Sequence, residues 1–332
     1  MKILVIAPNW VGDTVMAQPL LMLLHQRHAN LALDVLAPPF TLPLLTRMPE
    51  VRRAMPARLG HGELKLGERQ RIAHELQAEH YDQAIVLPNS LKSALIPLLA
   101  RIPKRTGFRG EMRYGLLNDL RRLDEHALPR MVDRFAALAL DHGVPQAENV
   151  PSPRLMASLE DAKQIVQKQL LATESPITIL CPGAEYGPAK RWPTEHFSEL
   201  ARELSTRGHA VWLLGSPKDS DSAEAIVQAS NGACVNLCGK TSLAEAIDLM
   251  SLATQVVTND SGLMHVAAAL DKPTLALYGS SSPRFTPPLS DKAKVISLKL
   301  SCSPCFKREC PLQHFNCMRH LTPQHVLREA GL

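Results

Sequence analysis

The stretch Thr258-Asn259-Asp260-Ser261-Gly262-Leu263-Met264-His265 decides the fold expected for this chain. A β-branched run, residues 256–258, leads into it, and an Ala-rich segment, residues 266–270, follows it. This order predicts a strand, a polar turn and a helix. The N–H groups at such a helix start attract anions, and Gly262 lets a ligand approach the backbone closely. The same turn also suits an ordinary strand-to-helix link, so both interpretations stay open here.

The first half of the chain alternates apolar runs with helical patterns. The runs at residues 3–7, 33–37 and 84–87 predict buried strands, and residues 20–28 and 67–79 have helical spacing. Alternating strands and helices indicate a parallel sheet covered on both faces, a Rossmann-like α/β fold. No G-x-G-x-x-G follows the first strand, and Gly239-Lys240-Thr241 lacks the upstream glycine of a P-loop. A nicotinamide or P-loop site is therefore not expected.

The second half repeats this pattern after a proline-bearing stretch at residues 150–155. A helix is expected over residues 159–171, and the strands are expected at residues 177–180, 210–214, 234–237, 255–258, 274–278 and 295–298. We expect an N-terminal domain of residues 1–155 and a C-terminal domain of residues 156–320. Two such domains would face one another across a ligand-binding cleft. Residues 321–332 are expected to form a final helix.

The composition describes an ordinary globular protein with a mildly basic charge. The apolar fraction is 45%, the charged fraction is 21% and the formal net charge is +5. Basic residues gather between residues 101 and 134, which suits a phosphorylated substrate or a lipid headgroup surface, or is simply a solvated helix face. Aromatic residues make up only 4% of the chain and no motif interleaves them with cations, so nucleic acid is not expected as a partner. No apolar run reaches bilayer length, and we expect a cytoplasmic protein.

Asp13 lies in a glycine-containing turn after the first strand, at or near the start of a helix. An N-cap is a very common use of Asp at such a position. A carboxylate at the carboxyl end of a strand also lies where ligands bind in open α/β sheets. The two roles are compatible.

Two loops of the second half carry candidate ligand residues. The loop at residues 181–193 presents Lys190 and Arg191 just before a helix, where a lysine would neutralise a diphosphate as a point charge, or where both cations are simply solvated. Asp219 and Asp221 follow the strand at residues 210–214. Either carboxylate could accept hydrogen bonds from a ribose, or serve as an N-cap or surface residue.

Taken together, these motifs resemble the ADP-heptose:lipopolysaccharide heptosyltransferases, a glycosyltransferase family with the GT-B fold. The matching pieces are Asn9-Trp10-Val11-Gly12-Asp13, the loop from Pro182 to Pro193, Asn259-Asp260-Ser261-Gly262-Leu263-Met264-His265, and the cysteine-rich tail. The resemblance extends over nearly the full chain. The opening motif and the tail are more similar to the enzymes that add the second inner-core heptose than to those that add the first.

The resemblance implies an inverting transfer of L-glycero-D-manno-heptose from ADP-heptose to the heptose of heptosyl-Kdo2-lipid A, without a cofactor or catalytic metal. It places the general base at Asp13, where a carboxylate would take the proton of the attacking hydroxyl. Lys190 and the helix start Ser261-Gly262-Leu263 would stabilise the departing diphosphate. Asp260 and His265 would shape the loop, although a carboxylate beside a diphosphate repels it. His265 also suits a packed helix histidine.

The acceptor carries phosphates and carboxylates, so the resemblance gives the basic residues of the first domain a purpose. Lys92, Arg109 and Arg113 are the candidate acceptor contacts. The same surface would hold the enzyme peripherally on the cytosolic face of the inner membrane. The last helix, residues 321–332, would pack back on the N-terminal domain, as is common in GT-B folds.

The tail contains four cysteines, Cys302, Cys305, Cys310 and Cys317, with His314 between the last two. Thiolates and one C-x2-C spacing suit a structural zinc site, but the other two spacings are irregular. The sequence favours reduced, packed thiols, with a structural zinc site as the alternative. The odd total of seven cysteines does not suggest a disulfide scaffold.

Three other activities fit parts of the pattern. A different core heptosyltransferase or a nucleotide-sugar epimerase would share the fold and the nucleotide-binding motifs. A non-catalytic nucleotide-binding module would keep the second-domain motifs and would have no use for Asp13.

Overall fold

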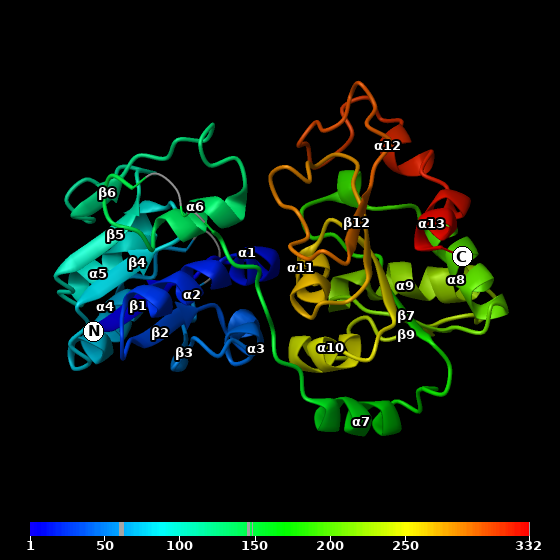
Figure 1. Ribbon diagram of the computed structural model, residues 1–332, viewed down its shortest axis with the longest axis horizontal. Helices are drawn as coiled ribbons and strands as arrows, with labels where there is room; N and C mark the ends of the chain where they lie inside the picture. Colours follow the sequence, from blue (N-terminus) through cyan, green and yellow to red (C-terminus); the bar gives the residue numbers. More distant parts are fainter. Residues whose placement is uncertain (60–62, 145–146, 148, 332) are drawn as a thin grey trace. The chain divides into compact units, whose positions relative to one another are not determined.

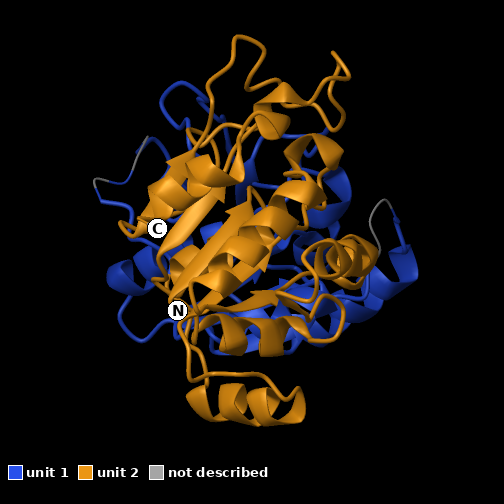
Figure 2. Cartoon of the chain, turned by 90° about the vertical axis from the view of Figure 1, so that its right-hand side faces the viewer, with its two compact units in different colours: residues 1–153 blue, residues 154–332 orange. Residues whose placement is uncertain are grey.

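The structure, a computed structural model, describes residues 1–59, 63–144, 147 and 149–331. The chain forms two compact units, Met1–Pro153 (unit 1) and Arg154–Leu332 (unit 2), which are coloured separately in Figure 2. The division falls inside the proline-bearing stretch at residues 150–155. Each unit is an α/β fold around its own sheet (Figure 1).

Unit 1 is built on a six-stranded sheet in the order β3-β2-β1-β4-β5-β6, and every neighbouring pair is parallel. Its strands are β1 (Lys2–Ile6), β2 (Ala32–Ala37), β3 (Arg53–Pro56), β4 (Gln83–Val86), β5 (Lys104–Phe108) and β6 (Asp119–Arg121). The central strand β1 is apolar and buried, as expected of a strand with both faces covered.

The helices of unit 1 connect these parallel strands and supply the apolar side chains that cover the sheet. They are α1 (Val11–Met16), α2 (Gln18–Arg27), η1 (Pro39–Thr41), α3 (Leu42–Leu45), α4 (Leu66–Gln77), η2 (Leu91–Ala94), α5 (Leu95–Leu99) and α6 (Met131–Ala137). Ile72 and Leu76 of α4 pack with Ala84 and Val86 of β4 in one buried cluster. Crossover connections of this kind are what parallel strands require.

Unit 2 repeats the same strand order. Its six-stranded sheet runs β12-β11-β10-β7-β8-β9, again with parallel pairs throughout. Its strands are β7 (Ile177–Cys181), β8 (Ala210–Leu213), β9 (Val235–Asn236), β10 (Gln255–Asn259), β11 (Thr274–Leu277) and β12 (Ala293–Ile296). When the strands of each unit are numbered from its own first strand, both sheets have the order 3-2-1-4-5-6, which is the Rossmann order.

The helices of unit 2 pack around its sheet and, with β-strand residues, form one large core. They are α7 (Leu159–Lys168), η3 (Pro188–Lys190), α8 (Thr194–Thr206), η4 (Pro217–Asp219), α9 (Ser220–Ala229), α10 (Leu243–Met250), α11 (Gly262–Ala269), α12 (Asn316–Arg319) and α13 (Pro323–Ala330). Trp192 is buried in this core, stacks edge-on with Phe197 at 4.8 Å between ring centroids, and donates through Nε1 to the Leu321 carbonyl at 2.6 Å.

The expected helix at residues 321–332 is α13. Helix α13 packs against α8, β11 and β12, and its Val326 and Leu327 side chains are buried in the core of unit 2. Its expected packing on the N-terminal domain stays a prediction. Leu332 lies outside the described residues.

The predicted α/β class with two Rossmann-like halves is confirmed by these two sheets. The strands β3, β5 and β6 were not among the predicted elements. In the part of the chain that the structure describes, every helix is too short or too polar to cross a bilayer.

Candidate active site

Four of the predicted site residues follow the strands at the switch point of each sheet. The strand order reverses at β1/β4 in unit 1 and at β7/β10 in unit 2, and open α/β sheets bind ligands at such a point. Asp13 and Lys92 follow β1 and β4, while Lys190 and Asp260 follow β7 and β10. Each unit therefore brings its own predicted residues to one edge of one sheet.

The start of α11 has the features of an anion site. Ser261 is its N-cap residue with extended backbone, but its hydroxyl does not cap the helix and instead lies 3.3 Å from Thr258 Oγ1. Ser261, Gly262 and Leu263 are all half-buried, so the helix start is open to a ligand. The N–H groups of the first turn and the helix dipole are therefore directed at this opening.

Lys190 and Asp260 form an ion pair beside this helix start. Lys190 Nζ lies 2.6 Å from Asp260 Oδ2, and the Asp260 carboxylate is almost completely buried. The Lys190 ammonium also lies 5.2 Å from the centroid of the Tyr186 ring. The pair explains why a carboxylate is tolerated at a site for anions, because Lys190 neutralises it. The two residues are 70 positions apart in the chain, and no sequence pattern indicated their contact.

His265 is buried on α11 and lies near this pair. Burial lowers the pKa of His265 to about 4, which the charge of Asp260 partly opposes and that of Lys190 reinforces. The imidazole is consequently neutral at pH 7. This placement agrees with the packed helix histidine that was one of its two expected roles.

Asn259 joins the two loops that carry Lys190 and Asp260, and it was not among the predicted site residues. Its Oδ1 accepts the Trp192 backbone N–H at 3.0 Å, and its Nδ2 donates to the Pro182 carbonyl at 2.7 Å. The side chain is fully buried at the end of β10. The sequence did contain one sign of this bridging role, because a polar residue stands directly at the end of an apolar, buried strand.

Asp219 is held as a capping residue. Its Oδ2 accepts from the Ser216 N–H at 2.9 Å and from the Ser216 hydroxyl at 2.7 Å, in the capping box of η4. A Cβ at Gly183 would overlap this carboxylate, so only glycine fits beside it. The Arg191 guanidinium lies 3.8 Å from the Asp219 Oδ1 atom. Ser216 is the N-cap of this box and Asp219 is its third residue, while before α9 the Asp219 side chain makes no capping hydrogen bond. The expected N-cap role of Asp219 is therefore wrong, and contact with a ribose stays a prediction.

In unit 1, Asp13 lies in the first turn of α1, where Trp10 is the N-cap residue. The expected N-cap role of Asp13 is therefore wrong by three positions, although a carboxylate in the first turn still complements the helix dipole. Lys92 lies half-buried in η2 and Arg109 is exposed directly after β5. Because β1, β4 and β5 are neighbours, these three residues follow adjacent strands at one sheet edge.

Arg113 has a structural role, contrary to the predicted acceptor contact. It is 1% exposed, and its guanidinium donates to the carbonyl oxygens of Pro88, at 2.6 Å, and Phe108. Burial lowers its pKa. Arg105 and Arg121 likewise donate to backbone carbonyls of unit 1. Much of the basic segment at residues 101–134 thus holds loops together and is not an open cationic surface.

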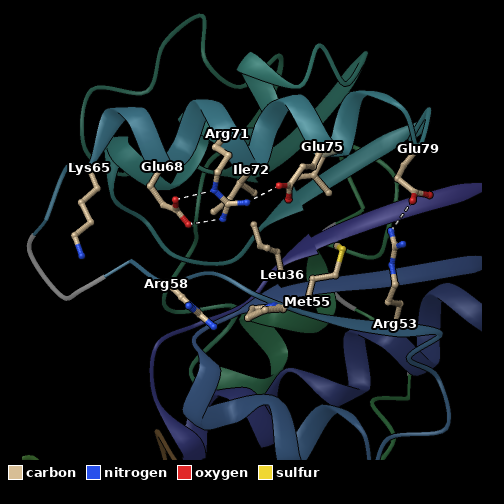
Figure 3. Close-up of a pocket in the computed structure, with 12 residues that line it drawn as sticks. Leu36, Arg53, Met55, Arg58, Lys65, Glu68, Arg71, Ile72, Glu75 and Glu79 are labelled. Atoms are coloured by element: carbon tan, nitrogen blue, oxygen red, sulfur yellow. Dashed lines mark hydrogen bonds and ion pairs between the residues drawn. The ribbon is translucent and has the colours of Figure 1, made fainter.

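A cavity of about 880 Å³ lies in unit 1 between β3 and α4 (Figure 3). Its walls carry both charges, and several are paired with each other: Arg71 with Glu68 and Glu75, and Arg53 with Glu79. Arg58 and Lys65 also line it. None of the predicted site residues lines it. Its mixed charge gives no reason to place a polyanionic substrate there.

Comparison with known proteins agrees with this geometry. The sequence profile of glycosyltransferase family 9 (heptosyltransferase) matches residues 69–316. The chain is 51% identical to lipopolysaccharide heptosyltransferase 2 of Salmonella typhimurium and 50% identical to that of Escherichia coli, each over 99% of this chain and 97% of the relative. It is also similar to the solved structure of E. coli ADP-heptose LPS heptosyltransferase II, with a TM-score of 0.90 and 46% identity over 100% of this chain and 98% of that one.

These matches extend over both units and include the Lys190 loop, the start of α11 and most of the cysteine-rich tail. The GT-B expectation is confirmed by the similarity to E. coli heptosyltransferase II. The chain belongs to glycosyltransferase family 9, the heptosyltransferases.

Proposed function

We propose that this protein transfers L-glycero-D-manno-heptose from ADP-heptose to the heptose of heptosyl-Kdo2-lipid A, with inversion at the anomeric carbon and release of ADP. The observation that carries the proposal is the 50–51% identity, over nearly the full length, to enzymes named lipopolysaccharide heptosyltransferase 2. Identity to a lipopolysaccharide heptosyltransferase 1, from Pseudomonas aeruginosa, is only 27%. The second inner-core transfer is therefore favoured over the first.

The donor diphosphate is assigned to the start of α11. Its free first-turn N–H groups are fixed donors that stabilise the charge that gathers on ADP as the glycosidic bond breaks. Lys190 adds a cation, although part of its charge is used by Asp260. Because fixed N–H donors and a lysine supply this stabilisation, we expect the reaction to need no added metal or cofactor.

The acceptor is assigned to unit 1, with Asp13 as general base. The attacking hydroxyl has a pKa far above 7, so a carboxylate must accept its proton during attack. Lys92 and Arg109 follow the two neighbouring strands and are the cations proposed to contact acceptor phosphates. An enzyme with this acceptor works at the cytosolic face of the inner membrane, and we propose peripheral contact there through these cations.

The test is ADP release from ADP-heptose, with and without heptosyl-Kdo2-lipid A. We expect release to require the acceptor, and Asp13→Asn to lower kcat about 10²–10⁴-fold while ADP still binds. Asp161→Asn is the matched control, because Asp161 is an exposed first-turn acid of α7. Release without the acceptor would instead indicate hydrolase or epimerase chemistry. ADP binding without any turnover would refute the transferase.

A further inference from the structure

The four tail cysteines surround one small cavity in unit 2. Its volume is about 20 Å³, room for one water-sized sphere. Cys302, Cys305, Cys310 and Cys317 all line it, and none is in a disulfide. Spacing in the sequence favoured separately packed thiols, but the fold places all four in the wall of one cavity. Four thiolates around one ion are the ligand set of a structural zinc site.

A second observation points to a ligand in this cavity. Ser280, in the same wall, is 2% exposed, and its hydroxyl has no hydrogen-bond partner among the described residues. An unpaired buried hydroxyl costs about 1–3 kcal/mol. A metal-bound thiolate would accept a hydrogen bond from this hydroxyl and remove that cost. The Phe315 N–H already donates to Cys310 Sγ at 3.4 Å, the kind of outer contact that supports a thiolate ligand.

The side chains are not arranged around an ion as they stand. Across the described residues, no group of three or more His, Cys, Asp or Glu side chains is placed to hold a metal. The Nδ1 atom of His314 accepts the Asn316 N–H at 3.0 Å, so this atom is used internally. A cysteine thiol, however, moves between three staggered positions by rotation about one bond. Rotation about this bond is the movement that would turn the four sulfur atoms toward one ion.

The tail also braces the loop that carries Lys190. The Ala189 N–H donates to the Arg308 carbonyl at 3.0 Å, and the Tyr186 hydroxyl donates to the Phe306 carbonyl at 3.0 Å. Ala189 is itself part of the cavity wall. The segment between Cys305 and Cys310 thus connects the cavity directly to the residue before Lys190.

We propose that Cys302, Cys305, Cys310 and Cys317 bind one thiophilic divalent metal ion of the zinc class, and that this ion fixes the tail against the Lys190 loop. The ion is structural and takes no part in the transfer step. Its binding is independent of the proposed function. Only the expected effect on ADP affinity rests on that function.

The first test uses the full-length wild-type protein, produced with added zinc. We expect about one zinc per chain by elemental analysis, and protection of the tail thiols from a thiol reagent until a chelator is added. Cobalt in place of zinc should show the absorption of tetrahedral thiolate coordination. Absence of stoichiometric metal together with absence of the cobalt–thiolate band would overturn the proposal.

The second test compares Cys305→Ala and Cys317→Ala with Cys234→Ala. Cys234 is a buried thiol in the core of unit 2 and lies outside the cavity. Loss of a residue that only supports a metal ligand lowers metal affinity roughly 10–100-fold. We expect both cavity variants to lose more than that, because each removes a ligand. We also expect both to bind ADP several-fold more weakly. Equal metal content in all three variants would mean adventitious binding. Failure of heptose transfer would leave the metal stoichiometry unaffected, so the two proposals can be refuted separately.

Discussion

The Asn259 side chain ties the Lys190 loop to the end of β10 through two buried hydrogen bonds. Leucine has a similar size and neither polar group, so Asn259→Leu would leave the Trp192 N–H and the Pro182 carbonyl unpaired. Each unpaired buried group costs about 1–3 kcal/mol, and we expect the free energy of unfolding of unit 2 to fall by about 2–6 kcal/mol.

Urea unfolding followed by tryptophan fluorescence measures this loss, since Trp192 and Trp212 are both buried in unit 2. Ser198→Ala is the control. Ser198 is equally buried, but its hydroxyl bonds only to the Thr194 carbonyl within α8. Equal stability of the two variants would contradict the bridging role of Asn259.

The Lys190–Asp260 pair predicts an unequal response to two substitutions. Lys190→Ala leaves the buried Asp260 carboxylate uncompensated beside the diphosphate site, so ADP affinity should fall steeply. The double variant Lys190→Ala/Asp260→Asn removes that charge as well and should recover part of the affinity. Calorimetric titration with ADP measures both. If the double variant bound no better than Lys190→Ala, neutralisation of Asp260 would not be the main function of Lys190.

His265 predicts a dependence of stability on pH. Its pKa is about 4 in the folded protein, against 6.5 for an ordinary histidine, because burial disfavours the charged form. Between these values the unfolded chain binds a proton that the folded chain excludes, so stability falls as pH falls from about 6.5 toward 4.

The neutral variant His265→Gln should flatten this part of the profile, measured by thermal unfolding at a series of pH values. His74→Gln, at an exposed position of α4, should leave it unchanged. An unaltered slope in His265→Gln would show that another group is responsible.

The loop at residues 181–193 depends on contact with the tail at Gly187. A Cβ at Gly187 would lie 2.5 Å from the Arg308 carbonyl oxygen, so Gly187→Ala must push the tail away from the loop. We expect a loss of about 1–3 kcal/mol in stability and weaker ADP binding, because Lys190 shifts with the loop. Gly67→Ala is the control, since no atom lies within 4 Å of that added carbon. Unchanged ADP affinity in Gly187→Ala would show that the tail does not position Lys190.

Among the elements, sequence patterns found those with long apolar runs and missed three strands of unit 1, β3, β5 and β6. The strands β1, β7 and β10 are buried along nearly their full length and were predicted close to their observed bounds. In contrast, β3 is an edge strand whose residues are exposed or half-buried, so it has no apolar run to detect. The three-residue strand β6 is too short for a periodic signal.

At the scale of the molecule, the two units have separate hydrophobic cores. Val326 and Leu327 of α13 belong to the core of unit 2, and Leu76 belongs to that of unit 1. We expect Leu327→Ala to cost about 2–5 kcal/mol and to act on unit 2. Hydrogen exchange should rise in β7 and β10 and stay unchanged in β1 and β4. Leu76→Ala should give the opposite pattern, and a uniform increase in both units would contradict separate cores.

The α/β class with two Rossmann-like halves followed from sequence, because alternating strands and helices restrict the topology, whereas the order of the strands came from the structure. The contacts within the site did not follow. The Lys190–Asp260 pair, the Asn259 bridge and the burial of Arg113 each depend on which loops meet in space. A local sequence pattern does not specify which distant loops come into contact.

The close fit of Gly183 against the Asp219 carboxylate has a consequence for the history of the family. A side chain at position 183 and an aspartate at position 219 cannot coexist unless the Asp219 side chain turns away from Ser216 or one loop shifts. Lineages that have replaced this glycine should therefore also have lost or shortened the acid. The two positions, 36 residues apart in the chain, should have evolved as a single unit.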